Sequence, residues 1–230
     1  MSGVLTLIPT PIDDQSPLEA VALARCQKAF DDGDIICVEE VNEGRRRWLR
    51  FGLPKEAIES FVLYNEHTRD EECGRLIKEL NKGKNVILMS DCGLPAFCDP
   101  GQDLVNRCHN SGIKVTSAPF ANSIALAIAL SGFDHSRFVF EGFVSNKSDS
   151  RSKELKRIAL SPDVSVVMDT PYRMKKLLEE FTKYCPDRMA FLGVELNQEN
   201  EKLFRASFSK LNSMIPKEKK EFILVLGPKG

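Results

Sequence analysis

The feature that most constrains the fold is a regular alternation, through the first half of the chain, of short apolar runs with amphipathic helical patterns. Val86–Met89 is typical of these runs, because its four residues are all apolar and do not alternate with polar ones. A strand of this kind is buried on both faces, as in a parallel sheet that helices cover on both sides. The first half is therefore predicted to be an α/β lobe with a largely parallel sheet.

Apolar periodicity and the residues that begin or end helices give the expected elements of this lobe. Ser16 is the expected N-cap of the first helix, and Asp99 that of the helix that starts near Pro100. The expected strands are Val4–Ile8, Ile35–Val38, Phe61–Leu63, Val86–Met89 and Ile113–Thr116, and the expected helices are Pro17–Phe30, Glu71–Leu80 and Gln102–Asn110.

The second half has more strands per helix, which predicts a second α/β lobe with a mixed sheet. We expect the lobes to span residues 1–117 and 118–230, with a hinge near residues 117–121. Residues 146–152 and 213–220 are expected to be loops. The expected strands are Phe138–Phe140, Val164–Met168, Met189–Val194, Leu203–Phe208 and Phe222–Leu226, and the expected helices are Ser123–Leu130, Lys153–Leu160 and Arg173–Tyr184.

Charge and cysteine usage exclude some classes of protein. The formal net charge of −1 gives no overall field that attracts nucleic acid, so contact with RNA would need a local basic patch. The seven cysteines include no C-x-x-C pair and the three histidines are scattered, which favours reduced thiols and no metal site. The longest apolar stretch, Ile124–Leu130, is too short to span a bilayer. We expect a cytoplasmic protein that makes no use of a membrane.

The segment Ser90–Gly101 follows one buried strand and precedes a helix, and ligands of open parallel sheets bind outside the carboxyl ends of the strands. Gly93 would let a ligand approach the backbone, and the carboxylate of Asp91 could accept hydrogen bonds from a ribose or an amino group. A plain tight turn explains the same residues. The chain has neither G-x-G-x-x-G nor G-x-x-x-x-G-K-[ST], which argues against a dinucleotide dehydrogenase and a P-loop NTPase.

Four other segments carry polar or basic side chains near predicted strand ends, in a helix or in a loop. Thr170–Arg173 follows the strand Val164–Met168 and also fits the start of a helix. His67 could transfer protons, although a surface or capping histidine is the simpler interpretation. Arg45–Arg47 would fan out over a solvated helix face or contact RNA together with the neighbouring Trp48, and Arg151 adds basic charge in a predicted loop.

In their order and spacing these segments resemble the tetrapyrrole-methylase (class III) superfamily of S-adenosylmethionine methyltransferases. Within it, the chain is most similar to the branch of bacterial 16S ribosomal RNA 2′-O-ribose methyltransferases, over nearly its whole length. The motifs that carry the resemblance are Leu7–Ile12, Asn65–His67, Ser90–Pro95, Asp99–Gly101, Ser131–Gly132, Phe138–Phe143, Thr170–Arg173 and Glu221.

The resemblance implies a homodimer of two-lobed chains with the cofactor in the cleft between the lobes. The implied cofactor is S-adenosylmethionine, with S-adenosylhomocysteine as product and no metal. Carried onto matching positions, the cofactor contacts are Pro9, Asp91, Gly93, Ala96, Phe97, Asn122, Ser123, Met168 and Asp169. A ribose hydroxyl as acceptor would need a proton acceptor, for which the candidates are Glu66, His67 and Glu195. The candidate substrate contacts are Arg45, Arg47, Arg151 and Arg173.

The chain departs from the family pattern at four places. Asp13–Asp14 replace Gly-Asn, Glu39–Asn42 replace Glu-Asp-Thr-Arg, residues 119–122 replace Pro-Gly-Pro-Ser, and Val194–Gln198 lose an arginine and a lysine. The cofactor side is kept better than the substrate side, so methyl transfer is predicted more firmly than ribosomal RNA or the small ribosomal subunit as partner. Two alternatives stay open: a non-catalytic or cofactor-sensing RNA or assembly protein on the same fold, and a small-molecule (tetrapyrrole-type) methylase.

Overall fold

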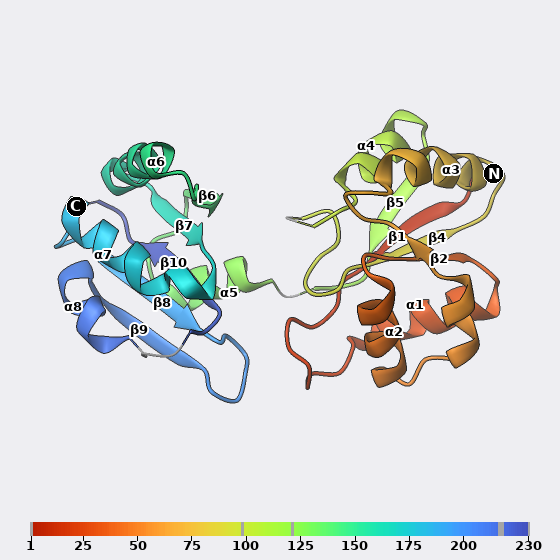
Figure 1. Cartoon of the computed structure of the whole chain (residues 1–230), viewed down its shortest axis with the longest axis horizontal. Helices are drawn as coiled ribbons and strands as arrows, with labels where there is room; N and C mark the ends of the chain where they lie inside the picture. The colour runs from red at the N-terminus through yellow and green to blue at the C-terminus, as the bar shows by residue number, and fades with distance from the viewer. Residues whose placement is uncertain (1, 98, 121, 216–218, 230) are drawn as a thin grey trace. The chain divides into compact units, whose positions relative to one another are not determined.

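The computed structural model describes residues 2–97, 99–120, 122–215 and 219–229. The chain divides into two compact units, Met1–Phe120 and Ala121–Gly230 (Figure 1). Of the predicted hinge, residue 121 lies outside the described residues, and so does Cys98 of the candidate loop. Within the described ranges, no helix combines the length and apolar character needed to span a bilayer.

The first unit contains a five-stranded sheet in the order β3-β2-β4-β1-β5, and every neighbouring pair is parallel. The prediction of a largely parallel sheet is confirmed, and central strand β4 is buried at every residue. Because all strands run the same way, the loops after them meet at one edge of the sheet. The strands are β1 (Val4–Ile8), β2 (Ile35–Val38), β3 (Val62–Leu63), β4 (Val86–Met89) and β5 (Lys114–Ser117).

Helices cover both faces of this sheet (Figure 1). One core joins Ile8 and Ile36 to Ala22 of α1 and Trp48 of α2. The other core, which includes Leu76, lies under α3 and α4. The helical elements are α1 (Ala20–Asp31), α2 (Val41–Arg50), the 3-10 helix η1 (Lys55–Ser60), α3 (Arg69–Asn81) and α4 (Gln102–Asn110).

Two predicted helix starts were wrong. Helix α1 begins three residues later than Pro17, and its N-cap is Glu19, whose side chain accepts a hydrogen bond from Ala22 N. Helix α4 is preceded not by Asp99 as cap but by Gly101, at φ 126°. A Cβ on Gly101 would lie 2.7 Å from Leu88 Cδ2, so glycine is required there for space as well as for conformation.

The second unit contains a five-stranded mixed sheet in the order β6-β7-β10-β8-β9, as predicted. Strands β6 and β7 are parallel, whereas β10 is antiparallel to β7 and to β8, and β9 is antiparallel to β8. The carboxyl ends of β6, β7 and β8 therefore share one edge with the amino ends of β9 and β10. The strands are β6 (Phe138–Phe143), β7 (Val164–Met168), β8 (Met189–Val194), β9 (Lys202–Ser207) and β10 (Phe222–Leu226).

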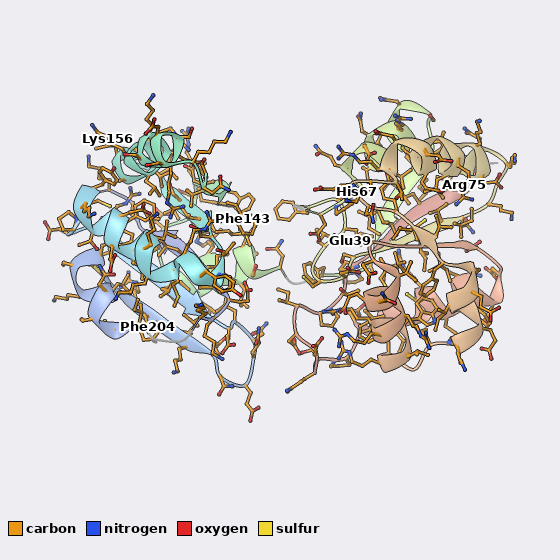
Figure 2. All side chains as sticks on the ribbon, in the orientation of Figure 1. Glu39, His67, Arg75, Phe143, Lys156 and Phe204 are labelled. Atoms are coloured by element: carbon orange, nitrogen blue, oxygen red, sulfur yellow. The ribbon has the colours of Figure 1, made fainter. Side chains whose placement is uncertain are left out.

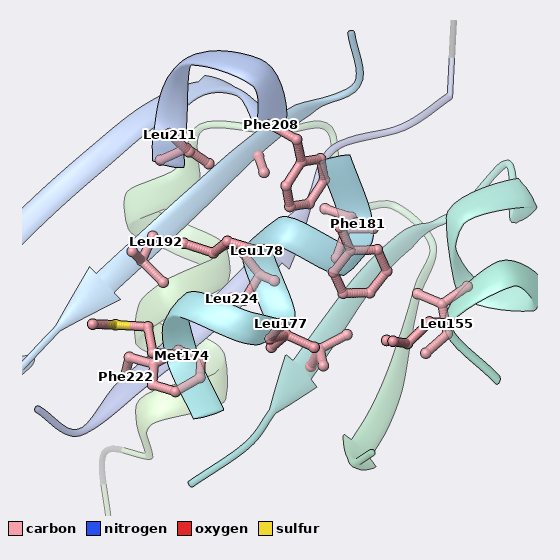
Figure 3. Packing of buried hydrophobic residues seen from close by; sticks show 14 of the residues in the cluster. Leu155, Met174, Leu177, Leu178, Phe181, Leu192, Phe208, Leu211, Phe222 and Leu224 are labelled. Carbon is pink, nitrogen blue, oxygen red and sulfur yellow. The ribbon is translucent and has the colours of Figure 1, made fainter. Parts of the chain in front are cut away.

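One face of this sheet packs against the apolar helix α5 (Ser123–Ser131). The other face packs against α6 (Ser148–Leu160), α7 (Met174–Tyr184) and α8 (Phe208–Met214), and the 3-10 turn η2 (Pro171–Arg173) leads into α7. Figure 3 shows the apolar side of α7 with α8 against β8 and β10.

One predicted loop and one strand end were wrong in this unit. The loop expected at 213–220 starts two residues later, after α8, and its residues 216–218 lie outside the described residues. Helix α6 already begins at Ser148, so most of the loop expected at 146–152 is helical. The polar residues 148–150 and 152 are exposed, whereas Arg151 is buried. Residues 208–214 form α8, whose Phe208 is fully buried, whereas the sequence predicted a strand end followed by a loop. A seven-residue helix shows too few turns for its apolar period to be recognised.

Candidate functional site

The loops after β1 and β4 are tied together at the carboxyl edge of the parallel sheet. Thr10 and Gly93 exchange backbone hydrogen bonds, with N–O distances of 2.9 and 3.0 Å. The buried Thr10 hydroxyl donates to Ser90 O (3.1 Å), and the Ser90 hydroxyl donates to Gly93 O (2.9 Å). These bonds hold Gly93 beside the exit of β1, where Pro9 is buried.

The loop after β4 adopts backbone conformations that most residues avoid. Gly93 has φ 86°, and a Cβ built there would meet nothing closer than Asp99 Oδ2 at 3.9 Å, so the space beside this glycine is open. Ala96 has φ 65°, which costs a non-glycine residue roughly 1 kcal/mol or more. Its N–H donates to Pro100 O (3.1 Å), which holds the strained turn. The loop is thus fixed in shape and open beside Gly93.

Three carboxylates gather around this loop. Glu39, directly after β2, accepts a hydrogen bond from Asp91 N at 3.4 Å. Burial, together with the charge of Glu39, raises the pKa of Asp91 to about 6. Burial and the charges of Glu39 and Asp91 raise the pKa of Asp99 to about 7. Repulsion between the groups therefore disfavours three simultaneous negative charges near pH 7.

One oxygen of Asp91 is left without a partner. Its Oδ1 is buried and accepts no hydrogen bond from any described residue. An unsatisfied buried acceptor is costly, and the cost is removed when a ligand supplies a donor. The ligand chemistry that fits is a hydroxyl pair or an ammonium group, placed in the open space next to Gly93.

The polar segment after β3 reaches the same edge. Asn65 Nδ2 donates to Glu39 O (3.3 Å), and Asn65 Oδ1 accepts from His67 N (2.9 Å). Glu66 and His67 have exposed side chains, and Figure 2 labels His67 and Glu39. The structure therefore brings Glu66 and His67 to the edge that carries Asp91.

The arginines of α2 do not all face solvent. The prediction that Arg45–Arg47 lie on a solvated helix face is wrong for Arg47. Arg47 is only 4% exposed; its Nε donates to Glu43 Oε1 (2.8 Å) and its Nη1 to Pro11 O (2.6 Å). Arg47 thus fixes the loop after β1. Arg45 is exposed and borders a cavity of about 360 Å³ lined by residues of α2 and η1.

In the second unit, the aspartate after β7 is fully engaged. Asp169 Oδ1 accepts a hydrogen bond from Thr170 N (2.8 Å) and forms an ion pair with Arg173 Nε (2.9 Å), and Oδ2 accepts from Arg151 Nη1 (3.0 Å). Its side chain has no exposed surface. Any ligand at this position would meet the backbone of Met168 and Asp169 rather than the carboxylate.

Arg151 lies inside the second unit rather than on a loop. It belongs to α6, is 3% exposed, and pairs with Asp169 and with Glu180 (Nε–Oε2 2.8 Å). The guanidinium therefore joins α6, the exit of β7 and α7, and the geometry gives it a structural role. Arg173, by contrast, keeps part of its side chain exposed.

Glu195 directly follows β8 at the same edge of the mixed sheet. It has φ 50°, a strained value for a non-glycine residue, and its N–H donates to Glu221 O (2.9 Å). Its Oε1 accepts from Lys220 Nζ at 3.0 Å. If Glu195 accepts a proton during the reaction, its carboxylate would do so while paired with Lys220.

The start of α5 lies toward this edge as well. Asn122 is its N-cap, with Oδ1 accepting from Ala125 N (2.9 Å). Phe133, just after α5, packs where β10 ends, since a Cβ on Gly227 would lie 2.8 Å from its ring. The carboxyl end of α5 therefore lies at the edge where β10 ends. Because α5 packs along β10 and β8, its first residues, Asn122 and Ser123, lie toward the other edge, which is the one where β7 and β8 end.

The predicted residues thus form one set in each unit. The set in the first unit is Pro9, Asp91, Gly93, Ala96 and Phe97 with Glu66 and His67; the set in the second is Asn122, Ser123, Met168, Asp169, Arg173 and Glu195. Sequence reasoning missed Glu39 and the electrostatic role of Asp99. The position of Glu39 directly after a buried strand was a usable signal.

The family profile described as Tetrapyrrole (Corrin/Porphyrin) Methylases matches residues 25–212. The chain therefore belongs to the tetrapyrrole methylase family, and the prediction of a methyltransferase is confirmed.

Two relatives match over nearly the whole chain. A "Ribosomal RNA small subunit methyltransferase I" of Thermotoga maritima is 29% identical over 94% of this chain and 94% of its own length. A protein of the same description from Neisseria meningitidis serogroup B is 28% identical over 99% of this chain and 77% of its own length. Among solved structures, a diphthine synthase has a TM-score of 0.71 at 16% identity, covering 99% of this chain and 90% of its own, which supports the fold.

Proposed function

We propose that this methyltransferase takes its methyl group from S-adenosylmethionine and transfers it to a ribose 2′-hydroxyl of small-subunit ribosomal RNA. Membership of the family and the description of the near-full-length relatives support the reaction and the acceptor. The observation that carries the cofactor assignment is the buried, unpartnered Oδ1 of Asp91, in the same loop as Gly93 with its open space.

The residues of the first unit fit the polar groups of this cofactor. The ribose hydroxyls or the ammonium group of S-adenosylmethionine would donate to Asp91 Oδ1, and Gly93 leaves room for close approach to the backbone. Pro9, Ala96 and Phe97 are proposed to contact it from the same edge. We propose the same for Asn122, Ser123 and Met168 and for the backbone of Asp169. When bound, the sulfonium supplies a methyl group that needs no metal to activate it.

Transfer to a hydroxyl requires alignment and removal of one proton. The hydrogen bonds of Thr10, Ser90 and Gly93 fix the cofactor loop before the ligand arrives, so little ordering is needed on binding. His67 is our first choice as proton acceptor, because its exposed imidazole carries a nitrogen that can accept a proton and lies on a backbone anchored by Asn65. Glu66 and Glu195 are the alternatives.

Two measurements test this proposal. Calorimetric titration with S-adenosylhomocysteine is expected to show saturable binding, and the absence of both heat and thermal stabilisation at millimolar ligand would refute the cofactor assignment. Incubation with labelled S-adenosylmethionine and small ribosomal subunits, followed by digestion to nucleosides, is expected to yield label in a 2′-O-methylribose. Label in a base instead would refute the ribose acceptor. Labelling of a tetrapyrrole but not of RNA would show that the protein is a small-molecule (tetrapyrrole-type) methylase.

The resemblance also implies a homodimer, which we propose as the working form. Light scattering after gel filtration is expected to give twice the chain mass of 25.8 kDa. A monomer at catalytic concentrations would contradict it.

A further inference from the structure

Tyr172 is an aromatic side chain that the fold holds out in solvent. It is 75% exposed and lies in the turn η2, directly after β7. An exposed aromatic ring alone is ordinary. The backbone beneath this ring and the charges around it are the features that need an explanation.

The turn that carries Tyr172 is anchored on a buried carboxylate. Asp169 binds Thr170 N (2.8 Å) and Arg173 Nε (2.9 Å), and its other oxygen binds the buried Arg151 (3.0 Å). Arg173 Nε also donates to Thr170 Oγ1 at 3.2 Å. The residues on both sides of Tyr172 are therefore fixed, so a partner that contacts the ring does not have to order the backbone first.

The surroundings of the ring are cationic. Lys219 Nζ lies 4.6 Å from the centre of the Tyr172 ring. Arg173 follows Tyr172, and the exposed Lys175 and Lys176 occupy the first turn of α7, which contains no acidic residue. Helix N-termini normally favour acidic side chains, so cations in this turn are unfavourable toward the helix dipole, although Lys175 also lies 4.0 Å from Glu179 one turn further on. They make a positive surface on a chain whose net charge is −1.

We propose that Tyr172 is a stacking platform for an unpaired base of the RNA acceptor, with Lys219, Lys175 and Lys176 contacting the flanking phosphates. Single-stranded RNA is bound in this way, by aromatic faces among cations. The proposal rests on the proposed function and deepens it. The platform lies at the edge of the mixed sheet where Met168 ends β7, so a stacked base would hold its strand beside proposed cofactor contacts.

The test uses the full-length chain and a fluorescein-labelled single-stranded RNA of twelve mixed nucleotides, with a duplex of equal length for comparison. Fluorescence anisotropy is expected to show that Tyr172→Ala weakens single-strand binding roughly tenfold. Tyr172→Phe is expected to stay within about twofold, because the ring is kept. Lys219→Ala should weaken binding and reduce the salt slope by about one phosphate contact.

Tyr184→Ala is the matched control. Tyr184 is the same residue type at the other end of α7, with its hydroxyl bonded to Ser152 Oγ at 2.8 Å, and its loss is expected to leave RNA binding unchanged. Thermal unfolding of Tyr172→Ala should match the unsubstituted chain, since the ring is mostly exposed.

Failure of the platform and failure of the proposed function are distinguishable. Wild-type affinity in Tyr172→Ala, or no binding of single-stranded RNA by the unsubstituted chain, would overturn the platform even if ribosomal subunits are methylated. Binding that depends on Tyr172 without methyl transfer to subunits would uphold the platform and refute the proposed function.

Discussion

Two aspartates lie just after inner strands of the two sheets, and they have opposite surroundings. Asp91, after β4, has a buried oxygen with no hydrogen-bond partner among the described residues, and Glu39 beside it raises its pKa. Asp169, after β7, has both oxygens bonded to Arg151, Arg173 and a backbone N–H. An aspartate just after a strand is thus proposed to bind a ligand in one unit, whereas in the other unit it holds the fold together. Partners, rather than position, decide the role.

Removing the Asp169 carboxylate should have the largest effect on stability. Asp169→Ala leaves the buried Arg151 without one of its two carboxylate partners, and we expect a loss of about 3–5 kcal/mol in the free energy of unfolding, measured by urea denaturation. Asp187→Ala, at an exposed aspartate, should stay within about 0.5 kcal/mol. A loss below about 1 kcal/mol for Asp169→Ala would remove the contrast between the two aspartates.

Removing the charge of Asp91 should reduce ligand binding instead. Asp91→Asn is expected to weaken S-adenosylhomocysteine roughly tenfold to a hundredfold, the usual worth of a hydrogen bond to a charged group. Calorimetry measures this affinity, and thermal unfolding at pH 7.5 should show no loss of stability. Because the folded-state pKa is raised above 3.8, the ionised carboxylate disfavours folding at that pH, and asparagine removes this cost. Destabilisation with unchanged affinity would make Asp91 a second structural aspartate.

The pH dependence of binding should follow the raised pKa of Asp91. A ligand that donates to the ionised carboxylate binds less well once this group is protonated, so affinity should fall roughly tenfold from pH 8 to pH 5, with a midpoint near the pKa of about 6. Titrations at several pH values check this, with Asp91→Asn expected to flatten the profile. An equally steep profile in that variant would point to another group, of which Asp99 is the nearest candidate.

Filling the space beside Gly93 should have the smallest effect. Gly93→Ala places a methyl group at φ 86° with only Asp99 nearby, and we expect about 1 kcal/mol of strain and a several-fold loss of S-adenosylhomocysteine affinity. Gly112→Ala, at φ 66° with nothing within 4 Å of the added Cβ, should show the same strain and unchanged affinity. Equal affinities in the two variants would place the ligand elsewhere.

Much of the fold is predictable from the sequence, because buried strands and helix faces appear in it as patterns of apolar residues. The wholly apolar Val86–Met89 indicated the centre of a parallel sheet, and the residues after it were correctly placed at the carboxyl edge. Asp91 and Gly93 could therefore be selected without coordinates.

The roles of the charged residues were not predictable in the same way, since they depend on partners distant in sequence. Arg151 lies in a polar segment that looks solvated, yet it is buried because Asp169 and Glu180 neutralise it. Arg47 is buried because the carbonyl of Pro11, far along the chain, accepts its hydrogen bond. Asp99 resembles a helix cap, and only the packing of Gly101 shows that it is not one.

The most direct test is the pKa of Asp91 itself, measured by NMR of the ¹³C-labelled carboxyl with and without saturating S-adenosylhomocysteine and assigned with Asp91→Asn. We predict a value near 6 in the free protein and a clear decrease with ligand, because donors to the unpartnered Oδ1 stabilise the ionised form. A value that the ligand leaves unchanged would contradict the assignment of Asp91 as the residue that holds the cofactor.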